Sequence, residues 1–187
     1  MRGALRGRPG RTEARGRQPG AAPLPEGFDR ARAVHRAINT FECARDLGPE
    51  VARAPRRVGQ VMRNFLVPGS RLSQDDYAEA LWERQRLVEA FQTWAEPYDA
   101  ILTPPAPGEA KGRRVTGDSR FCTLWTLLGA PAITIPTGLG PAGLPLGLQL
   151  TARAGADTQL LAAAAWAEKQ LLLGACGPCG GTGSANS

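Results

Sequence analysis

The feature that most limits what this chain can fold into is that only residues 28–173 have the apolar content of a packed core. Residues 1–27 hold six Arg and four Pro but no Phe, Tyr, Trp, Ile or Val, and residues 174–187 are Gly-rich and carry no charge. Segments of this composition bury too little apolar surface to offset the entropy that is lost on ordering. We therefore expect two disordered tails, 1–27 and 174–187, around one folded unit.

Hydrophobic periodicity within this unit predicts five helices and three strands. Ser73 and Asp76 have the spacing of a capping box, which predicts the start of the longest helix. Gly48-Pro49 predicts the end of the first helix, and Pro68-Gly69-Ser70 the end of the second. The helices are expected near 29–48, 56–66, 73–97, 118–129 and 157–171, and the strands near 100–103, 132–136 and 146–150.

The order of these elements predicts an α/β fold with a mixed sheet of few strands, flanked by helices. Nearly thirty residues with a helix among them separate the first two strands, which is long enough for a parallel crossover. A Gly-rich reversal at 138–143 predicts that the last two strands pair antiparallel. The strand at 100–103 lacks polar alternation, so both its faces must be covered. Three strands would leave sheet edges that these helices cannot all shield.

Charge and hydropathy argue against several classes of function. The net charge is +6, and four of these charges belong to residues 1–27, so the folded unit offers no strong basic surface to a nucleic acid. No apolar run approaches the ~20 residues of a membrane span, and no apolar region follows the basic N-terminus as it would in a secretion signal. We expect a cytoplasmic chain without a membrane partner.

Each reactive group in the sequence has a plainer structural explanation. Cys176-Gly-Pro-Cys179 has the sequence of a redox motif, but it follows a helix instead of opening one, and it offers a zinc ion two of four ligands. His35 is the only histidine, and we expect it to be solvated on the polar face of a helix. Ser119 and Lys111 are a Ser–Lys pair in a Gly-rich loop that would not hold them in place. The sequence therefore predicts no independent catalytic centre, no metal site and no cofactor.

Five motifs follow one another in the second half of the chain. They are Tyr98-Asp-Ala-Ile-Leu-Thr-Pro104, Gly117-Asp118 with Phe121, Trp125-Thr-Leu-Leu-Gly-Ala-Pro-Ala-Ile-Thr-Ile-Pro136, Gly143-Leu-Pro-Leu-Gly-Leu-Gln-Leu150, and Asp157-Thr-Gln-Leu-Leu161 with Trp166-Ala-Glu168. In this order they resemble the C-terminal third of the amidase signature family, over about residues 28–171. The resemblance implies hydrolysis of a carboxamide C–N bond in a small-molecule amide, or amide transfer in the glutamyl-tRNA amidotransferase branch.

The catalytic residues of that family have no counterpart among the 187 residues. The family uses a Ser nucleophile, a second Ser and a Lys base, which lie in its N-terminal half beside a Gly-Gly-Ser-Ser-Gly-Gly-like stretch. The resemblance thus implies the C-terminal part of an amidase-family hydrolase that is inactive alone. One alternative is a non-catalytic partner that joins an N-terminal amidase half and completes either a split amidase or the A-type component of an amidotransferase. The other alternative is a nucleic-acid binder that acts through its basic tail, and the charge distribution argues against it.

Asp118, Phe121 and Trp125 are the predicted substrate-pocket residues. Loops at strand ends and helix N-termini are where α/β folds hold substrates, and the resemblance implies that this region forms a wall of the pocket. The three side chains would set substrate shape and polarity without reacting themselves. The structural alternative is that Asp118 is an N-cap, which is worth about 1 kcal/mol, and that Trp125 packs in the core.

Overall fold

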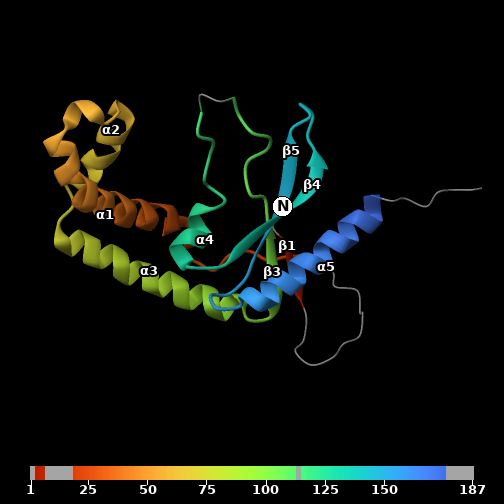
Figure 1. Ribbon diagram of the computed structural model, residues 1–187. Helices are drawn as coiled ribbons and strands as arrows, with labels where there is room; N and C mark the ends of the chain where they lie inside the picture. Colours follow the sequence, from red (N-terminus) through yellow and green to blue (C-terminus); the bar gives the residue numbers. More distant parts are fainter. Residues whose placement is uncertain (1–2, 7–18, 113–114, 176–187) are drawn as a thin grey trace, which may run out of the picture.

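The computed structural model describes residues 3–6, 19–112 and 115–175 and shows a five-stranded sheet with helices on both faces (Figure 1). The α/β class predicted from the sequence is confirmed. The helices are α1 (Ala31–Arg53), α2 (Gln60–Gly69), α3 (Gln74–Ala95), α4 (Thr123–Leu128) and α5 (Asp157–Ala175), with 3-10 turns at Phe28–Arg30 and Pro55–Arg57. The strands are β1 (Gly3–Arg6), β2 (Pro19–Ala21), β3 (Tyr98–Thr103), β4 (Ala132–Leu139) and β5 (Pro145–Thr151).

The sheet order is β2-β1-β3-β5-β4, and every pairing between the described strands is antiparallel. The predicted antiparallel pairing of β4 with β5 is confirmed. Since β5 is antiparallel to both β3 and β4, these two run in the same direction, as the crossover predicts. They are not neighbours, however, because β5 follows β4 through a tight turn and lies between β3 and β4. The predicted mixed sheet, in which β3 and β4 would pair as parallel neighbours, was therefore wrong.

The N-terminal segment supplies one edge of this sheet. Gly3–Arg6 pairs with β3 from Leu102 to Tyr98, and Pro19–Ala21 pairs with Gly3–Arg6 on its other side. The prediction that residues 1–27 lack structure is therefore wrong for these two segments, because backbone pairing along an open strand edge does not require large apolar side chains. Residues 1, 2, 7–18 and 176–187 lie outside the described residues, and disorder there stays a prediction.

Helix α1 continues beyond the predicted stop at Gly48-Pro49 and ends at Arg53. A proline inside a helix costs about 3 kcal/mol in lost hydrogen bonding and crowding. The compensation is tertiary, since α2 folds back onto α1 and buries Leu66. The contact is so close that a Cβ added at Gly69 would clash with the backbone carbonyl of Thr40. Packing between α1 and α2 thus overrides the local stop signal.

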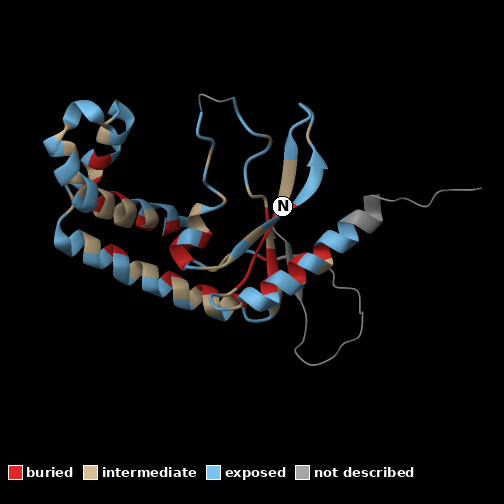
Figure 2. Ribbon diagram, viewed as in Figure 1, coloured by how far each residue is buried: buried red, intermediate tan, exposed pale blue. Residues whose placement is uncertain are grey.

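Two hydrophobic clusters lie on the two faces of the sheet (Figure 2). One combines α1, α3 and α4 with the β3 residue Ile101, and its largest members are Phe28, Phe91 and Trp125. The other places α5 against β3, β4 and β5 and consists mainly of alanines around Leu150 and Leu160. Ala100 belongs to the second cluster and Ile101 to the first, which confirms that both faces of this strand are covered.

Candidate functional site

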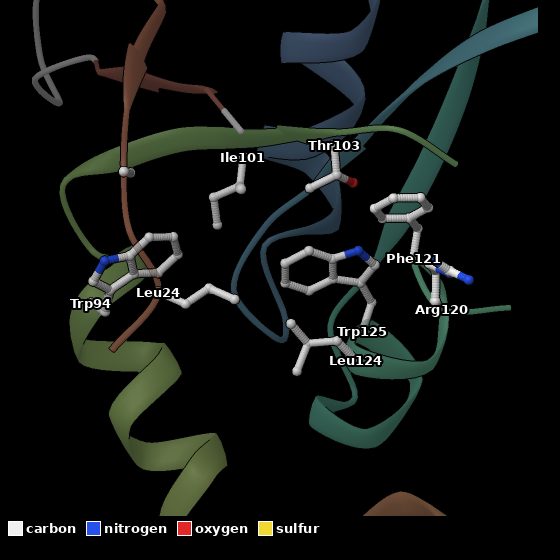
Figure 3. A pocket seen from close by; sticks show the side chains of 9 residues that line it. Leu24, Trp94, Ile101, Thr103, Arg120, Phe121, Leu124 and Trp125 are labelled. Atoms are coloured by element: carbon white, nitrogen blue, oxygen red, sulfur yellow. The ribbon is translucent and has the colours of Figure 1, made fainter. Parts of the chain in front are cut away.

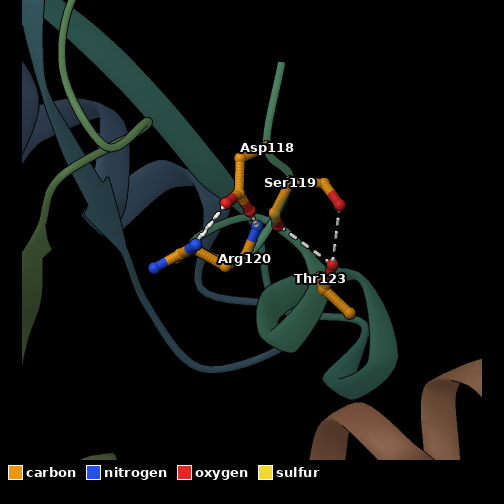
Figure 4. Close-up of polar contacts among 4 residues, drawn as sticks. All are labelled: Asp118, Ser119, Arg120 and Thr123. Atoms are coloured by element: carbon orange, nitrogen blue, oxygen red, sulfur yellow. Dashed lines mark hydrogen bonds and ion pairs between the residues drawn. The ribbon is translucent and has the colours of Figure 1, made fainter. Parts of the chain in front are cut away.

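The loop that leads into α4 is held by a local ion pair between Asp118 and Arg120 (Figure 4). The Asp118 carboxylate accepts a hydrogen bond from the backbone N–H of Arg120 at 3.0 Å and another from its Nε at 2.7 Å. These bonds from Arg120 lower the pKa of Asp118, and the nearby positive charge of Arg32 adds to the effect. The loop therefore presents an ionised carboxylate whose position is fixed by its neighbour.

Helix α4 begins later than the sequence predicts. Its N-cap is Cys122, which has no side-chain capping bond, so the structural alternative in which Asp118 is the N-cap was wrong. The backbone carbonyl of Ser119 instead accepts hydrogen bonds from the N–H of Cys122 and from the N–H and hydroxyl of Thr123, each at 2.9 Å. Asp118 therefore does not cap the N-terminus of α4, and its carboxylate forms an ion pair with Arg120.

Phe121 and Trp125 line the same cavity, which has a volume of about 40 Å³ (Figure 3). Phe121 precedes α4 and Trp125 lies within it, so the turn and the helix place both rings on one wall. The remaining lining residues are Ala22, Leu24, Trp94, Ile101, Thr103, Arg120 and Leu124. A cavity of this size has room for water molecules or a small chemical group but not for a whole drug-sized ligand.

The indole nitrogen of Trp125 is the unusual polar atom of this cavity. Trp125 is only 5% exposed, its ring packs 5.7 Å from that of Phe91, and its Nε1 has no hydrogen-bond partner among the described residues. In Figure 3 the nitrogen is turned toward the side where Thr103 and Phe121 lie. A buried N–H without an acceptor costs about 1–3 kcal/mol, so it marks a place where an acceptor from a ligand would be stabilised.

A larger groove of about 640 Å³ lies beside this cavity, between the loop after β3 and the start of β5. Asp118 and Lys111 line this groove with residues 105–110 and Pro145–Gly147. The structure therefore separates the three predicted residues, because Phe121 and Trp125 line the small cavity whereas Asp118 lines the larger groove. Arg120 connects the two, since it lines the cavity and binds Asp118.

Sequence reasoning missed Arg120, Thr103, Leu24 and Trp94 as cavity residues. A cation two residues after Asp118 was a usable signal for Arg120. Thr103, Leu24 and Trp94 come from β3, from the segment before α1 and from α3, and no local pattern connects them with α4. Thr103 is buried and its hydroxyl donates to the side-chain oxygen of Gln149 at 3.4 Å.

The structure does not bring the other reactive groups of the described residues together. The hydroxyl of Ser119 accepts a hydrogen bond from the hydroxyl of Thr123 at 3.3 Å (Figure 4). Lys111 instead lines the groove. His35 is half-buried rather than solvated, and burial lowers its pKa, so it is mostly neutral near pH 7. Cys176-Gly-Pro-Cys179 lies outside the described residues.

Among the described residues there is no group of three or more His, Cys, Asp or Glu side chains that could hold a metal ion. Within that same part of the chain, no helix has the length and apolar character needed to cross a bilayer.

A protein-family model described as Amidase matches residues 29–161, and the chain belongs to this family. The A component of the glutamyl-tRNA(Gln) amidotransferase of Granulibacter bethesdensis is 32% identical over 157 residues, which cover 76% of this chain and 30% of that protein. A fatty acid amide hydrolase of Medicago truncatula is 29% identical over 152 residues, covering 74% of this chain and 25% of that protein.

The fold is also found among solved structures. A crystal structure of an amidase superposes with a TM-score of 0.66 and 26% identity, over 78% of this chain and 36% of that one. The chain thus spans between a quarter and a little over a third of the length of these relatives.

Proposed function

We propose that this chain is the C-terminal part of an amidase domain, that it forms one wall of the substrate pocket, and that it does not hydrolyse amides alone. The observation that supports this best is the cavity at the start of α4, which has aromatic walls and an unpartnered Trp125 N–H but no activated nucleophile. Such a wall can bind and orient a substrate. It cannot attack the carbonyl carbon.

The three described serines have structural roles instead of catalytic ones. Ser73 caps α3, since its hydroxyl oxygen accepts from the N–H of Asp76 at 3.1 Å. Ser70 donates to the carbonyl of Val67 at 3.0 Å, and Ser119 contacts Thr123. An amidase nucleophile needs a base within hydrogen-bond reach, and no described serine is hydrogen-bonded to a lysine or a histidine.

The geometry supports specific roles for the wall residues. The Trp125 N–H can donate to a carbonyl oxygen of the substrate, and the carboxylate of Asp118 can accept from an amide N–H₂ group in the groove. The rings of Phe121 and Trp125 with Leu124 leave room for a small apolar end group. A small carboxamide with an apolar substituent is the substrate class that this combination fits.

Activity measurements on the purified 187-residue chain test the inactive assignment. We expect no turnover of acetamide, benzamide or indole-3-acetamide and no labelling by a fluorophosphonate serine probe. The matched control is Ser119→Ala, because Ser119 is the serine nearest in sequence to the candidate pocket residues. Stoichiometric labelling of the wild-type chain that Ser119→Ala abolishes, with loss of turnover, would show that the chain carries its own nucleophile.

A further inference from the structure

A groove of about 450 Å³ lies between helices α1, α3 and α4, which contact one another. It shares no lining residue with the cavity at the start of α4 or with the groove beside Asp118. We call it the interhelical groove. The residues that give it its chemical character are His35, Ile38, Asn39, Glu42, Leu81 and Arg84.

Helix α1 lines the interhelical groove with one continuous stripe. His35, Ile38, Asn39 and Glu42 follow one another at intervals of three, one and three residues, which places them on the same face of the helix. Burial lowers the pKa of His35, so its imidazole is mostly neutral near pH 7. Among the described residues that line the groove, Arg84 is therefore the one cation at neutral pH and Glu42 the one anion.

Arg84 is held in place by the end of α4. Its Nε donates to the backbone carbonyl of Leu127 at 2.7 Å. This carbonyl is one of the last four of α4, which have no partner within the helix. The bond leaves the two terminal nitrogens of the guanidinium available, and no carboxylate of the described residues forms an ion pair with them.

Glu42 is also held in place without being neutralised. Its Oε1 accepts a hydrogen bond from the hydroxyl of Tyr77 at 2.7 Å, and the Tyr77 ring stacks on Phe41 with centroids 4.4 Å apart. Arg45, which follows on α1, binds Asp46 at 2.8 Å instead. The second oxygen of Glu42 accepts no hydrogen bond from the described residues.

The two charges belong to opposite ends of the interhelical groove. Tyr77, which binds Glu42, and Arg84 are seven residues apart on α3, which is two helical turns or about 10 Å along the axis. Ile38 and Leu81 supply apolar surface to the same groove, and Leu81 is 37% exposed. The groove thus has a fixed cation, an aliphatic lining and a fixed anion.

We propose that the interhelical groove binds a small zwitterion whose terminal carboxylate and terminal ammonium are joined by a short aliphatic chain, an ω-amino carboxylate. The carboxylate accepts hydrogen bonds from the two terminal nitrogens of Arg84, and the ammonium donates to the second oxygen of Glu42. The chain of the ligand covers Ile38 and Leu81.

A five-carbon ligand has the length that this arrangement needs. Extended 5-aminopentanoate places its nitrogen about 6 Å from its carboxyl carbon, and a charged hydrogen bond at each end adds about 2.8 Å. This span is close to the two helical turns that separate the two ends of the groove. Because the groove shares no lining residue with the candidate substrate pocket, the site is independent of the proposed function.

Titration of the full 187-residue chain with 5-aminopentanoate tests the site, by calorimetry and by NMR of its methyl groups. We expect one binding site with a Kd on the order of 1 mM or tighter, and shifts of the methyl signals of Ile38 and Leu81. Pentanoate lacks the ammonium and pentylamine lacks the carboxylate. Each should bind at least about tenfold more weakly, because each leaves one charge of the groove without a partner.

Two variants remove one charge each. Glu42→Gln keeps the shape of the side chain and an acceptor for Tyr77, and Arg84→Gln removes the guanidinium. Each should weaken binding of 5-aminopentanoate at least about tenfold. The matched controls are Glu168→Gln and Lys169→Gln, which are exposed on α5 across the sheet and should change the affinity less than about twofold.

The single-charge ligands distinguish lost recognition from lost structure. Glu42→Gln should leave the weak binding of pentanoate unchanged, and Arg84→Gln that of pentylamine, whereas a disturbed fold would weaken every ligand. Circular dichroism checks that each variant is folded. If Arg84→Gln does not fold, Glu42→Gln and the three ligands still decide.

Any of three results would overturn the site. One is the absence of saturable binding of 5-aminopentanoate to the folded wild-type chain at ~10 mM. Another is binding of pentanoate or pentylamine as tight as that of the zwitterion. The last is an affinity for 5-aminopentanoate that Glu42→Gln leaves as high as Glu168→Gln does.

Discussion

The two faces of the sheet are packed in different ways. On one face, the buried residues that α5 contributes are Leu160 and three alanines, whose small side chains allow the helix to approach the sheet closely. On the other face, aromatic residues from α3 and α4 meet at angles, with Phe91 and Trp125 inclined at 48°. The cavity and the unpartnered Trp125 nitrogen are both on this second side.

We propose that this difference in packing divides the two faces between stability and ligand binding. Small side chains allow a helix to approach a sheet without gaps, so the α5 face is closely packed. Large planar rings that meet at angles leave irregular space, and this space adjoins the loop that carries Asp118. A face that keeps a cavity and an unmet hydrogen-bond donor is incompletely packed for folding but suited to receive a ligand. The following predictions test this contrast.

Truncation of the aromatic core should have the largest effect. Phe91 is fully buried and contacts the rings of Trp94 and Trp125. We expect Phe91→Ala to lower the free energy of unfolding by about 3–5 kcal/mol, through lost burial and a residual cavity. Urea unfolding followed by circular dichroism measures this, and tryptophan fluorescence of the native state should change as well. A loss below about 1 kcal/mol would mean that this face collapses freely around the missing ring.

The matching truncation on the other face is Leu160→Ala. Leu160 is the largest buried side chain that α5 contributes, and its loss should cost about 2–3 kcal/mol. Trp166 packs in the same cluster as Leu160, so both truncations are compared in a Trp166→Phe background. In that background, native tryptophan fluorescence should change much less with Leu160→Ala than with Phe91→Ala, because Trp94 and Trp125 pack in the cluster across the sheet. Equal fluorescence changes in the two variants would show that the faces are coupled and that the comparison does not hold.

Replacing Trp125 by Phe separates the contribution of the aromatic ring to stability from that of the N–H group. The variant keeps an aromatic side chain in the cavity wall but removes the unpartnered donor, so lost packing and relief of the donor should nearly cancel, within about 1 kcal/mol. The control is Trp125→Ala, which loses the ring too and should cost about 3–5 kcal/mol. A Trp125→Phe variant as unstable as Trp125→Ala would indicate that the nitrogen has a partner in solution, such as a bound water molecule.

The smallest effect concerns Asp118 and its pH dependence. The ion pair with Arg120 lowers the pKa of Asp118 below 3.8, so it stabilises the folded state above this pH and the contribution disappears as pH falls through the folded pKa. Asp118→Asn should therefore be slightly less stable than wild type near neutral pH, and the difference should vanish in acid. NMR titration of the Asp118 carboxylate measures the pKa directly, and a value at or above 3.8 would exclude the pairing in solution.

The three predicted pocket residues could be selected from the sequence because they occupy one short segment. Asp118, Phe121 and Trp125 lie within eight residues, so a motif followed by a helix start was sufficient to select all three. The division of these residues between a cavity and a groove was not predictable, since it depends on where α3, β3 and the N-terminal segment lie. Whether the three contact a substrate stays a prediction.

The sequence by itself determined what depends on neighbours along the chain. The capping box of Ser73 and Asp76 is confirmed, as are the stop of α4 at Gly129 with φ 62° and the antiparallel pairing of β4 with β5. Tertiary structure alone decided the place of β5 between β3 and β4, the use of Gly3–Arg6 as a strand, and the run of α1 through Pro49. Helix caps and turns are fixed by residues a few positions apart, whereas strand order and the tolerance of a proline depend on which distant segments bury surface together.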